Sequence, residues 1–320
     1  MLGLALIMLS GTGGAGLRML ANRYESSVIK ELLLDPGARR ERSGVSGPLN
    51  YLLVGSDQFT SNPSTDHRSD TIMIAHLPAG LRQAYLISVP RDLLVEIPPA
   101  PATDHPGGTD KINSSFQYGG GGAGGVQLLS ATLSRLTGIR FDGAALINFS
   151  GFRRVIDLLG GVRMCVDTPT QSIHTKTVFD AGCQQMDGAR ALDYARQRYD
   201  LPNGDFDRQR HQQQLLRAMM DKATTTGVVA NPVRLDQVVR AVGSSFTVDT
   251  NGVPLEELIF ALRGLRSDSL LGIQVPSHPE EVDELSYVLL DDAATSLFES
   301  MRGTNLDGWA RDHPNWVNRL

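Results

Sequence analysis

The sequence predicts a single α/β domain with helices on both faces of a sheet. Short apolar runs typical of buried strands alternate along the chain with segments whose apolar residues recur at helical spacing. Of the 320 residues, 41% are hydrophobic and 20% are charged, which is enough apolar material for a packed core and excludes a disordered chain. The length suits one large domain or two modest ones, and no internal repeat divides the chain.

The individual elements follow from local patterns. The predicted strands are short apolar runs bounded by turn residues, over residues 49–54, 71–77, 84–89, 144–149, 162–166 and 271–275. The predicted helices carry apolar residues three and four positions apart, over residues 126–136, 152–159, 189–198, 208–222, 255–265 and 293–301. The glycine cluster at 119–125 is not a dinucleotide-binding motif, because no strand leads into it.

The N-terminal region predicts a membrane anchor. Residues 1–17 carry no charged side chain and 2–9 are strongly apolar, although a full membrane span needs about 20 apolar residues. Arg18 and Arg23 follow this run and no basic residue precedes it, an order explained if the true start of the protein lies upstream. An ordinary buried helix over 1–30 is the alternative. The expected organisation is an anchor, a linker and one domain, over residues 1–22, 23–47 and 48–320.

Two cysteines bear on the compartment. Cys165 and Cys183 lie on either side of a polar segment, and neither belongs to a CxxC or His-containing metal pattern. Cysteines that bracket a loop suit a single disulfide in an oxidising compartment, and two unpaired buried thiols are the alternative. Together with the anchor-like start, the pair favours a single-pass membrane protein whose domain lies outside the cytoplasm.

The charge balance excludes one class of partner and suggests another. A net charge of −5 and the lack of a helix-turn-helix pattern argue against a dedicated nucleic-acid binder. Four of the 30 basic residues are lysines and the rest are arginines, the side chain that grips phosphate with two hydrogen bonds. A GC-rich genome gives the same bias, so the positions of particular arginines must decide between the two explanations.

Three predicted loops at strand ends carry aspartate and arginine. Asp57 follows the first strand, Arg68 and Asp70 precede the second, and Arg91 and Asp92 follow the third. Ligands of α/β sheets bind at strand ends. Carboxylates without His or Cys suit a hard cation such as Mg²⁺, and arginines beside them suit phosphate oxygens. Each residue alone is better explained by a surface ion pair or a turn, but Mg²⁺ and arginine at one site are the combination that phosphoryl transfer needs.

A second basic cluster lies near residue 200. Arg196 and Arg198 are two positions apart at a helix end, and Arg208 and Gln212 share one face of the next helix. Lys111 follows a Pro/Gly-rich loop. A solvated basic surface is the alternative for this cluster. No GxSxG, HExxH or Walker A motif is present, so the sequence does not predict a covalent mechanism.

Nine ordered motifs together resemble the LytR-CpsA-Psr family. They cover about residues 48–225 and comprise Asn50–Asp57, Arg68–Met73, Ser88–Asp92, Lys111–Asn113, Asn148–Phe152, Asp157–Val162, Asp187–Leu192, Tyr194–Arg198 and Asp205–Gln213. The resemblance implies an α/β/α sandwich with a central mixed sheet and an apolar lipid-binding pocket. Members of this family look like membrane-anchored phosphotransferases outside Gram-positive cells. They move a glycopolymer from a polyprenyl-pyrophosphate carrier onto peptidoglycan.

The resemblance also implies roles for particular residues. Asp57 and Asp70 would hold Mg²⁺, or Mn²⁺, against the pyrophosphate. The phosphates would be bound by Arg68, Arg91, Lys111, Arg196, Arg198, Arg208 and Gln212. Arg91 and Asp92 are the candidate catalytic residues, with Asp92 an untested candidate for the general base. The family commonly has arginine at the position of His211, where this chain departs from the pattern.

Several questions remain open at the level of the sequence. The arginine-rich composition and the cysteine pair resemble actinobacterial members, so arabinogalactan or a related wall glycan is a candidate polymer. A polyprenyl-pyrophosphate hydrolase is one alternative, since water and a sugar hydroxyl are chemically close. A non-catalytic lipid-phosphate-binding regulator of envelope assembly is another.

Overall fold

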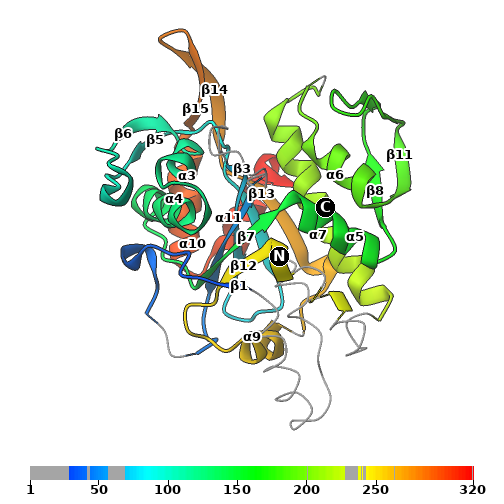
Figure 1. Cartoon of the computed structure of the whole chain (residues 1–320), viewed down its shortest axis with the longest axis horizontal. Coiled ribbons are helices and arrows are strands. Elements are labelled where there is room, and N and C mark those ends of the chain that lie inside the picture. The colour runs from blue at the N-terminus through cyan, green and yellow to red at the C-terminus, as the bar shows by residue number, and fades with distance from the viewer. Residues whose placement is uncertain are drawn as a thin grey trace.

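The protein is built around an eight-stranded mixed sheet (Figure 1). The computed structural model describes residues 29–41, 44–56, 69–199, 201–227, 237, 238, 240, 243–262, 264–318 and 320. In order across the sheet, the strands are β1 (Ile29–Lys30), β12 (Phe246–Asp249), β7 (Gly143–Asn148), β2 (Leu49–Ser56), β3 (Ser69–Leu77), β4 (Ala84–Ser88), β13 (Leu270–Gln274) and β16 (Val317–Asn318).

The strand directions bring several chain ends to one edge of the sheet. β2 runs parallel to β7 and antiparallel to β3, while β4 is antiparallel to β3 and parallel to β13. The ends of β2, β4, β7 and β13 therefore lie at the same edge as the start of β3. Loops that are far apart in the sequence meet there.

Helices cover both faces of the sheet, which confirms the predicted α/β/α sandwich. Figure 1 shows α5 (Phe149–Leu158), α6 (Gly188–Arg196) and α7 (Asp205–Thr225) on one side of the sheet. The opposite side carries α3 (Ser114–Tyr118), α4 (Gly122–Thr137), α10 (Asp292–Arg302) and α11 (Leu306–Asp312). A further helix among the described residues is α9 (Leu255–Leu262).

Successive side chains of each central strand point to opposite faces of the sheet, so the apolar residues are divided between two cores. Leu53 and Met73 belong to the core under α5, α6 and α7, which we call the α7-side core. Their neighbours Leu52 and Ile74 belong to the core under α4 and α10, which we call the α4-side core. The apolar runs predicted as buried strands thus supply both layers.

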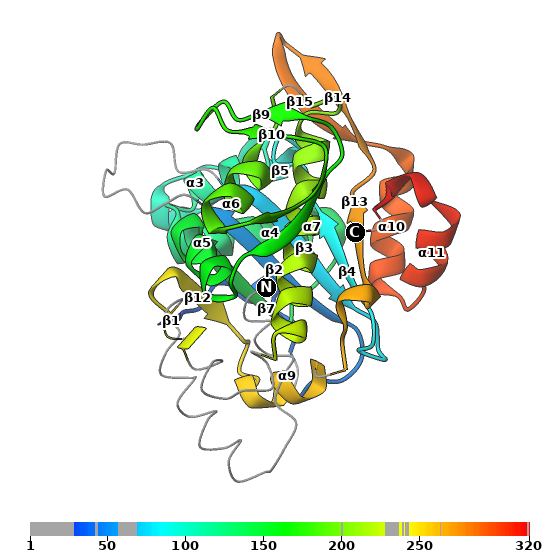
Figure 2. The same ribbon diagram turned by 90° about the vertical axis from the view of Figure 1, so that its right-hand side faces the viewer.

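Smaller two-stranded sheets surround this framework. They pair β5 (Leu94–Ile97) with β6 (Gly108–Lys111), β8 (Val162–Val166) with β11 (Gly182–Met186), β9 (Thr170–Gln171) with β10 (Val178–Phe179), and β14 (Ser277–Val282) with β15 (Leu285–Leu290). Cys165 on β8 lies directly opposite Cys183 on β11, and the two form a disulfide, as predicted. The β14–β15 hairpin projects away from the body in both views (Figure 2).

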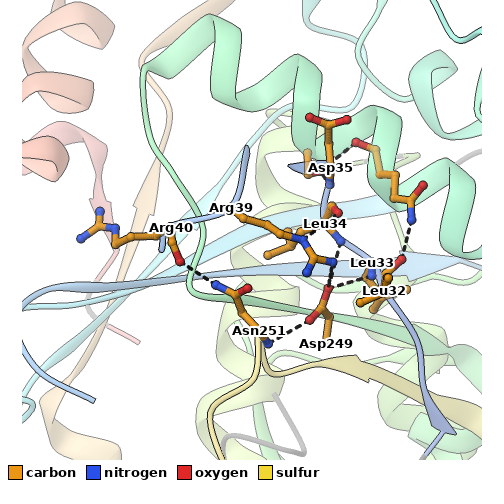
Figure 3. Close-up of polar contacts among 10 residues, drawn as sticks. Leu32, Leu33, Leu34, Asp35, Arg39, Arg40, Asp249 and Asn251 are labelled. Carbon is orange, nitrogen blue, oxygen red and sulfur yellow. Dashed lines mark hydrogen bonds and ion pairs between the residues drawn. The ribbon is translucent and has the colours of Figure 1, made fainter. Parts of the chain in front are cut away.

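The described part of the segment predicted as a linker, residues 23–47, packs against the domain (Figure 3). Leu33 and Leu34 are 0% and 1% exposed. Their backbone N–H groups donate to Asp249 Oδ2 at 2.9 and 3.2 Å, and Arg39 Nη2 reaches the same oxygen at 2.9 Å. The charged and Gly/Pro-rich composition of this segment concealed the apolar pair Leu33 and Leu34, whose burial stabilises the fold. Burial removes the N–H groups of Leu33 and Leu34 from water, and Asp249 replaces the lost hydrogen bonds to water.

The predicted anchor over residues 1–22 lies outside the described residues. Within the part of the chain that the structure describes, no helix combines the length and apolarity needed to cross a bilayer.

Candidate active site

The site forms where β3 starts and β4 ends. Asp70 is the second residue of β3, and Arg91 and Asp92 lie in the turn after β4, where the Leu93 N–H donates to the Pro90 carbonyl at 3.1 Å. Arg91 Nη1 donates to Asp70 Oδ1 at 2.7 Å, and Arg91 Nε lies 3.5 Å from Asp92 Oδ2. The antiparallel arrangement of β3 and β4 thus joins residues that the sequence placed in separate loops.

Helix α7 completes this cluster from one face of the sheet. Arg208 is 5% exposed, and its Nη2 donates to the Asp70 carbonyl at 3.1 Å. The same nitrogen lies 2.6 Å from Asp205 Oδ1, which is also 3.9 Å from Arg91 Nε. We call Asp70, Arg91, Asp205 and Arg208 the arginine cluster. Sequence reasoning did not select Asp205, although it stands three residues before Arg208 on a predicted helix.

The arginine cluster pairs two guanidinium groups that lie close together. Burial by itself would lower the pKa of Arg91. The negative charges of Asp92, Asp205 and Asp70 outweigh this effect, so the pKa of Arg91 lies above its ordinary value. Burial lowers the pKa of Arg208, and the positive charge of Arg91 adds to this effect. The Nε atoms of both arginines are buried and make no hydrogen bond with any described residue. Such buried donors suit an incoming anion, which would supply acceptors and further negative charge.

An apolar pocket opens beside this cluster on the α7 side of the sheet. Its cavity volume is about 70 Å³, and it is partly open to solvent. Its walls come from the ends of β2, β3 and β7 and from helices α5, α6 and α7: Leu53, Val54, Gly55, Thr71, Met73, Ile147, Phe149, Phe152, Leu192, Ala195, Arg196, Gln212, Leu215 and Leu216. Three polar side chains, Thr71, Arg196 and Gln212, thus join an otherwise apolar lining. The predicted apolar pocket is present.

The other predicted phosphate ligands have different surroundings. Arg196, at the end of α6, holds its Cζ 4.7 Å from the Phe149 ring in the pocket wall. Arg198 donates to the Tyr199 hydroxyl at 2.7 Å and, among the described residues, makes no hydrogen bond or ion pair with the arginine cluster. Lys111, at the end of β6, lies 3.2 Å from Asp92 and joins the cluster through that carboxylate. The structure therefore gathers Asp70, Arg91, Asp92, Lys111 and Arg208, with Arg196 and Gln212 lining the adjoining pocket.

The predicted metal ligands are described only in part. Asp57 and Arg68 lie outside the described residues, so their roles stay predictions. Among the side chains that are described, no three His, Cys, Asp or Glu gather as a metal site. Mg²⁺ is commonly held by one or two carboxylates together with substrate phosphates, and Asp70 supplies the hard oxygen ligands that this ion prefers. The donor chemistry at this sheet edge therefore fits Mg²⁺.

His211 is buried on α7, three residues after Arg208, and does not contribute a positive charge. Its Nε2 lies 3.0 Å from the Tyr194 hydroxyl, and the two rings stack with centroids 4.2 Å apart. Burial, together with the charge of Arg210, lowers the pKa of His211 to about 4. The imidazole is therefore neutral near pH 7 and packs α7 against α6.

Comparison with known proteins identifies the family. The model of the LytR_cpsA_psr family matches residues 21–302. The chain belongs to the LytR-CpsA-Psr family. It is 34% identical to the probable cell wall biosynthesis protein LcpB of Corynebacterium glutamicum, over 79% of this chain and 61% of that protein. The chain thus spans less than two thirds of that relative's length.

Further relatives support the fold. The chain is 26% identical to the polyisoprenyl-teichoic acid–peptidoglycan teichoic acid transferase TagU of Oceanobacillus iheyensis, over 76% of this chain and 72% of that protein. Among solved structures, the LytR-Csp2A-Psr enzyme from Actinomyces oris superposes with a TM-score of 0.59 at 20% identity, covering 82% of this chain and 96% of that one. At this identity the structural likeness shows the fold alone.

Proposed function

We propose that this LytR-CpsA-Psr protein is a Mg²⁺-dependent phosphotransferase that ligates a glycopolymer from a polyprenyl-pyrophosphate carrier onto peptidoglycan. The observation that carries the proposal is the apolar pocket beside the arginine cluster. A lipid pyrophosphate has an apolar tail next to a concentrated negative charge, and these two parts match the pocket and the cluster. The name of the TagU relative, a teichoic acid transferase, supports a reaction of this class.

The proposed binding mode assigns each part of the donor to a region of the site. The isoprenoid tail lies against Leu53, Met73 and Phe152, where burial of apolar surface contributes about 25 cal/mol per Å². The pyrophosphate lies between Arg91 and Arg208, whose buried Nε atoms make no hydrogen bond with any described residue. Arg196, in the pocket wall, reaches the lipid-side phosphate. Mg²⁺ held by Asp70, with Asp57, would neutralise further phosphate charge when bound.

The reaction follows from this arrangement. An acceptor hydroxyl of peptidoglycan, the muramic acid 6-OH, attacks the sugar-proximal phosphorus. The bond from this phosphorus to the bridging oxygen breaks, and the lipid phosphate leaves with that oxygen. The hydroxyl proton goes to a general base, for which Asp92 is the candidate because it neighbours Arg91. Arg91 and Arg208 stabilise the charge on the phosphoryl and leaving oxygens, which is the main catalytic requirement of phosphoryl transfer.

The proposed location is the outside of the cell membrane, with a single-pass N-terminal anchor. The disulfide between Cys165 and Cys183 supports an oxidising compartment. For the polymer, the LcpB relative from Corynebacterium is a cell wall biosynthesis protein by name, which supports a wall glycan such as arabinogalactan.

Replacement of Arg91 tests the proposal. With a lipid-linked glycan donor and peptidoglycan, Arg91→Ala should slow transfer on the order of 10³-fold, because a transition-state arginine contributes about 4 kcal/mol. Arg135→Ala, an exposed arginine on α4, is the matched control and should leave the rate unchanged. Normal transfer by Arg91→Ala would contradict the assignment. Release of phosphorylated glycan with no peptidoglycan adduct would identify a hydrolase instead.

Metal dependence needs a separate measurement. Removal of divalent ions with a chelator should abolish transfer, and Mg²⁺ should restore it. Asp70→Asn should raise the Mg²⁺ concentration needed for half-maximal activity, because an amide replaces a charged ligand. Full activity after exhaustive chelation would refute the metal requirement while leaving the transferase assignment in place.

A further inference from the structure

The β14–β15 hairpin is bonded directly to the loop that carries Arg91. The Val288 N–H donates to the Asp92 carbonyl at 3.0 Å, and Leu93 forms a parallel bridge with Val288. The hairpin therefore continues from the candidate active site to the projecting arm seen in Figures 1 and 2. Any group placed beside Asp92 lies close to the base of this arm.

One aromatic side chain of the hairpin stands next to the site. The Tyr287 ring centroid is 5.4 Å from Lys111 Nζ, and Lys111 in turn lies 3.2 Å from Asp92. The Tyr287 ring is half-buried, so part of it remains accessible beside the ammonium group. Leu285, two positions earlier on the same face of the strand, is 57% exposed. The hairpin thus presents an aromatic and apolar surface beside a cation.

The apolar pocket is lined by no residue of the β14–β15 hairpin, so the surface around Tyr287 lies outside it. The pocket walls include Leu53 and Leu215 of the α7-side core. Val95 on β5 and Val288 beside Tyr287 belong to the α4-side core. A donor with its tail in the pocket and its phosphates on the cluster would have its sugar end outside the pocket. Lys111 adjoins the cluster there through Asp92, and Tyr287 lies next to Lys111.

We propose that Tyr287 is a sugar-binding residue, whose ring packs against the C–H face of a carbohydrate joined to, or attacking, the phosphate. This inference rests on the proposed function, since it takes the tail and phosphate positions from it. A sugar ring carries apolar C–H faces and a rim of hydroxyls. The face of an aromatic ring is electron-rich and attracts such C–H groups, while Lys111 beside it can donate to a hydroxyl. Neither end of an isoprenoid chain offers this combination.

The test compares two lipids that differ only in the sugar. Binding of a short-chain polyprenyl pyrophosphate is measured beside that of the same lipid with one sugar on the terminal phosphate. Tyr287→Ala should bind the sugar-bearing lipid about fivefold to tenfold more weakly and the sugar-free lipid as wild type does. Tyr287→Phe keeps the ring and should retain binding. Ser286→Ala, an exposed neighbour on the other face of the strand, is the matched control.

A second arm identifies the source of the sugar. If the sugar-bearing donor binds Tyr287→Ala normally but the KM for a peptidoglycan acceptor rises about fivefold to tenfold, the residue holds the acceptor. Equal weakening of both lipids, or no change in either lipid or in the acceptor KM, would overturn the inference. Failure of wild-type protein to bind the sugar-free lipid would instead refute the proposed function. Thermal unfolding confirms that each variant is folded before it is compared.

Discussion

The two faces of the central sheet have the same alternating pattern of side chains, but one face forms a filled core and the other keeps a pocket. On the α4 side, large side chains such as Phe116 and Phe141 are completely buried and fill the space under the helices. On the α7 side, the layer narrows to Gly55, Thr71 and Ala195 near the ends of the strands, and the apolar pocket remains. Small side chains at this end of the α7 side thus leave a cavity, where large side chains fill the α4 side.

The largest expected difference between the faces concerns stability. Phe141→Ala, on the α4 side, should lower the free energy of unfolding by about 3–5 kcal/mol, because a fully packed site leaves a cavity. Phe152→Ala, in the pocket wall, should cost about 1 kcal/mol and weaken binding of a polyprenyl phosphate, since its ring is already half-exposed. Denaturant titration of both variants measures the difference, and equal losses would show that the pocket closes in solution.

The disulfide reinforces the α7 side. Cys165 and Cys183 join strands whose buried residues, Met164 and Met186, belong to the α7-side core. Replacing both cysteines with serine should lower the unfolding free energy by about 3 kcal/mol, because the bond closes an 18-residue separation in the unfolded chain. Denaturant titration of the variant and of reduced wild type should agree. An unchanged midpoint of denaturant unfolding would show that the disulfide does not contribute to the stability of this face.

A buried histidine on each face predicts a shared pH dependence. Burial lowers the pKa of His76, on the α4 side, and of His211, on the α7 side, from 6.5 to about 4 in each case. Between these values the unfolded chain binds more protons. Stability is therefore full above pH 6.5 and falls as the pH drops toward 4, by up to roughly 3 kcal/mol per group.

Glutamine variants separate the two contributions. His76→Gln and His211→Gln should each flatten the dependence of unfolding free energy on pH between 4 and 6.5, measured by urea titration at several pH values. If neither variant changes the slope, other groups cause the acid sensitivity.

The smallest expected effect tests the pocket itself. Ala195→Leu adds a side chain into the cavity and should weaken binding of a polyprenyl phosphate about tenfold with little loss of stability. Ala144→Leu, a buried alanine on the α4 side, should instead cost about 1–3 kcal/mol of stability through overpacking. Lipid titration and thermal unfolding of the pair distinguish these outcomes. Loss of stability without loss of lipid binding in Ala195→Leu would place the tail elsewhere.

Much of the framework was predictable because it rests on local patterns. The predicted strands correspond to β2, β3, β4, β7, β8 and β13, and the predicted helices to α4, α5, α6, α7, α9 and α10, with ends shifted by a few residues. The hairpin β14–β15 was missed. Its strand Ser277–Val282 contains a proline and two glutamates, so no buried apolar run marks it.

The candidate site was predictable where it follows strand ends and unpredictable where it depends on packing. Asp70 and Arg91 meet because β3 and β4 are neighbouring antiparallel strands. The sequence could predict this contact because both residues lie at the ends of predicted strands. Asp205 was missed, since an acidic residue in the first turn of a helix is expected for the helix dipole alone. Tyr287 reaches Lys111 only through a hairpin that the sequence does not reveal.

The hydrogen bond between Arg208 and the Asp70 carbonyl joins positions 138 residues apart. Such a contact needs both segments in place, and closing so long a separation costs more chain entropy than closing a local contact. Anion binding at this point therefore reports on the finished domain rather than on its parts. A pyrophosphate lodged there would also cross-link the sheet edge to α7, so that a saturating ligand protects the whole fold against unfolding and proteolysis.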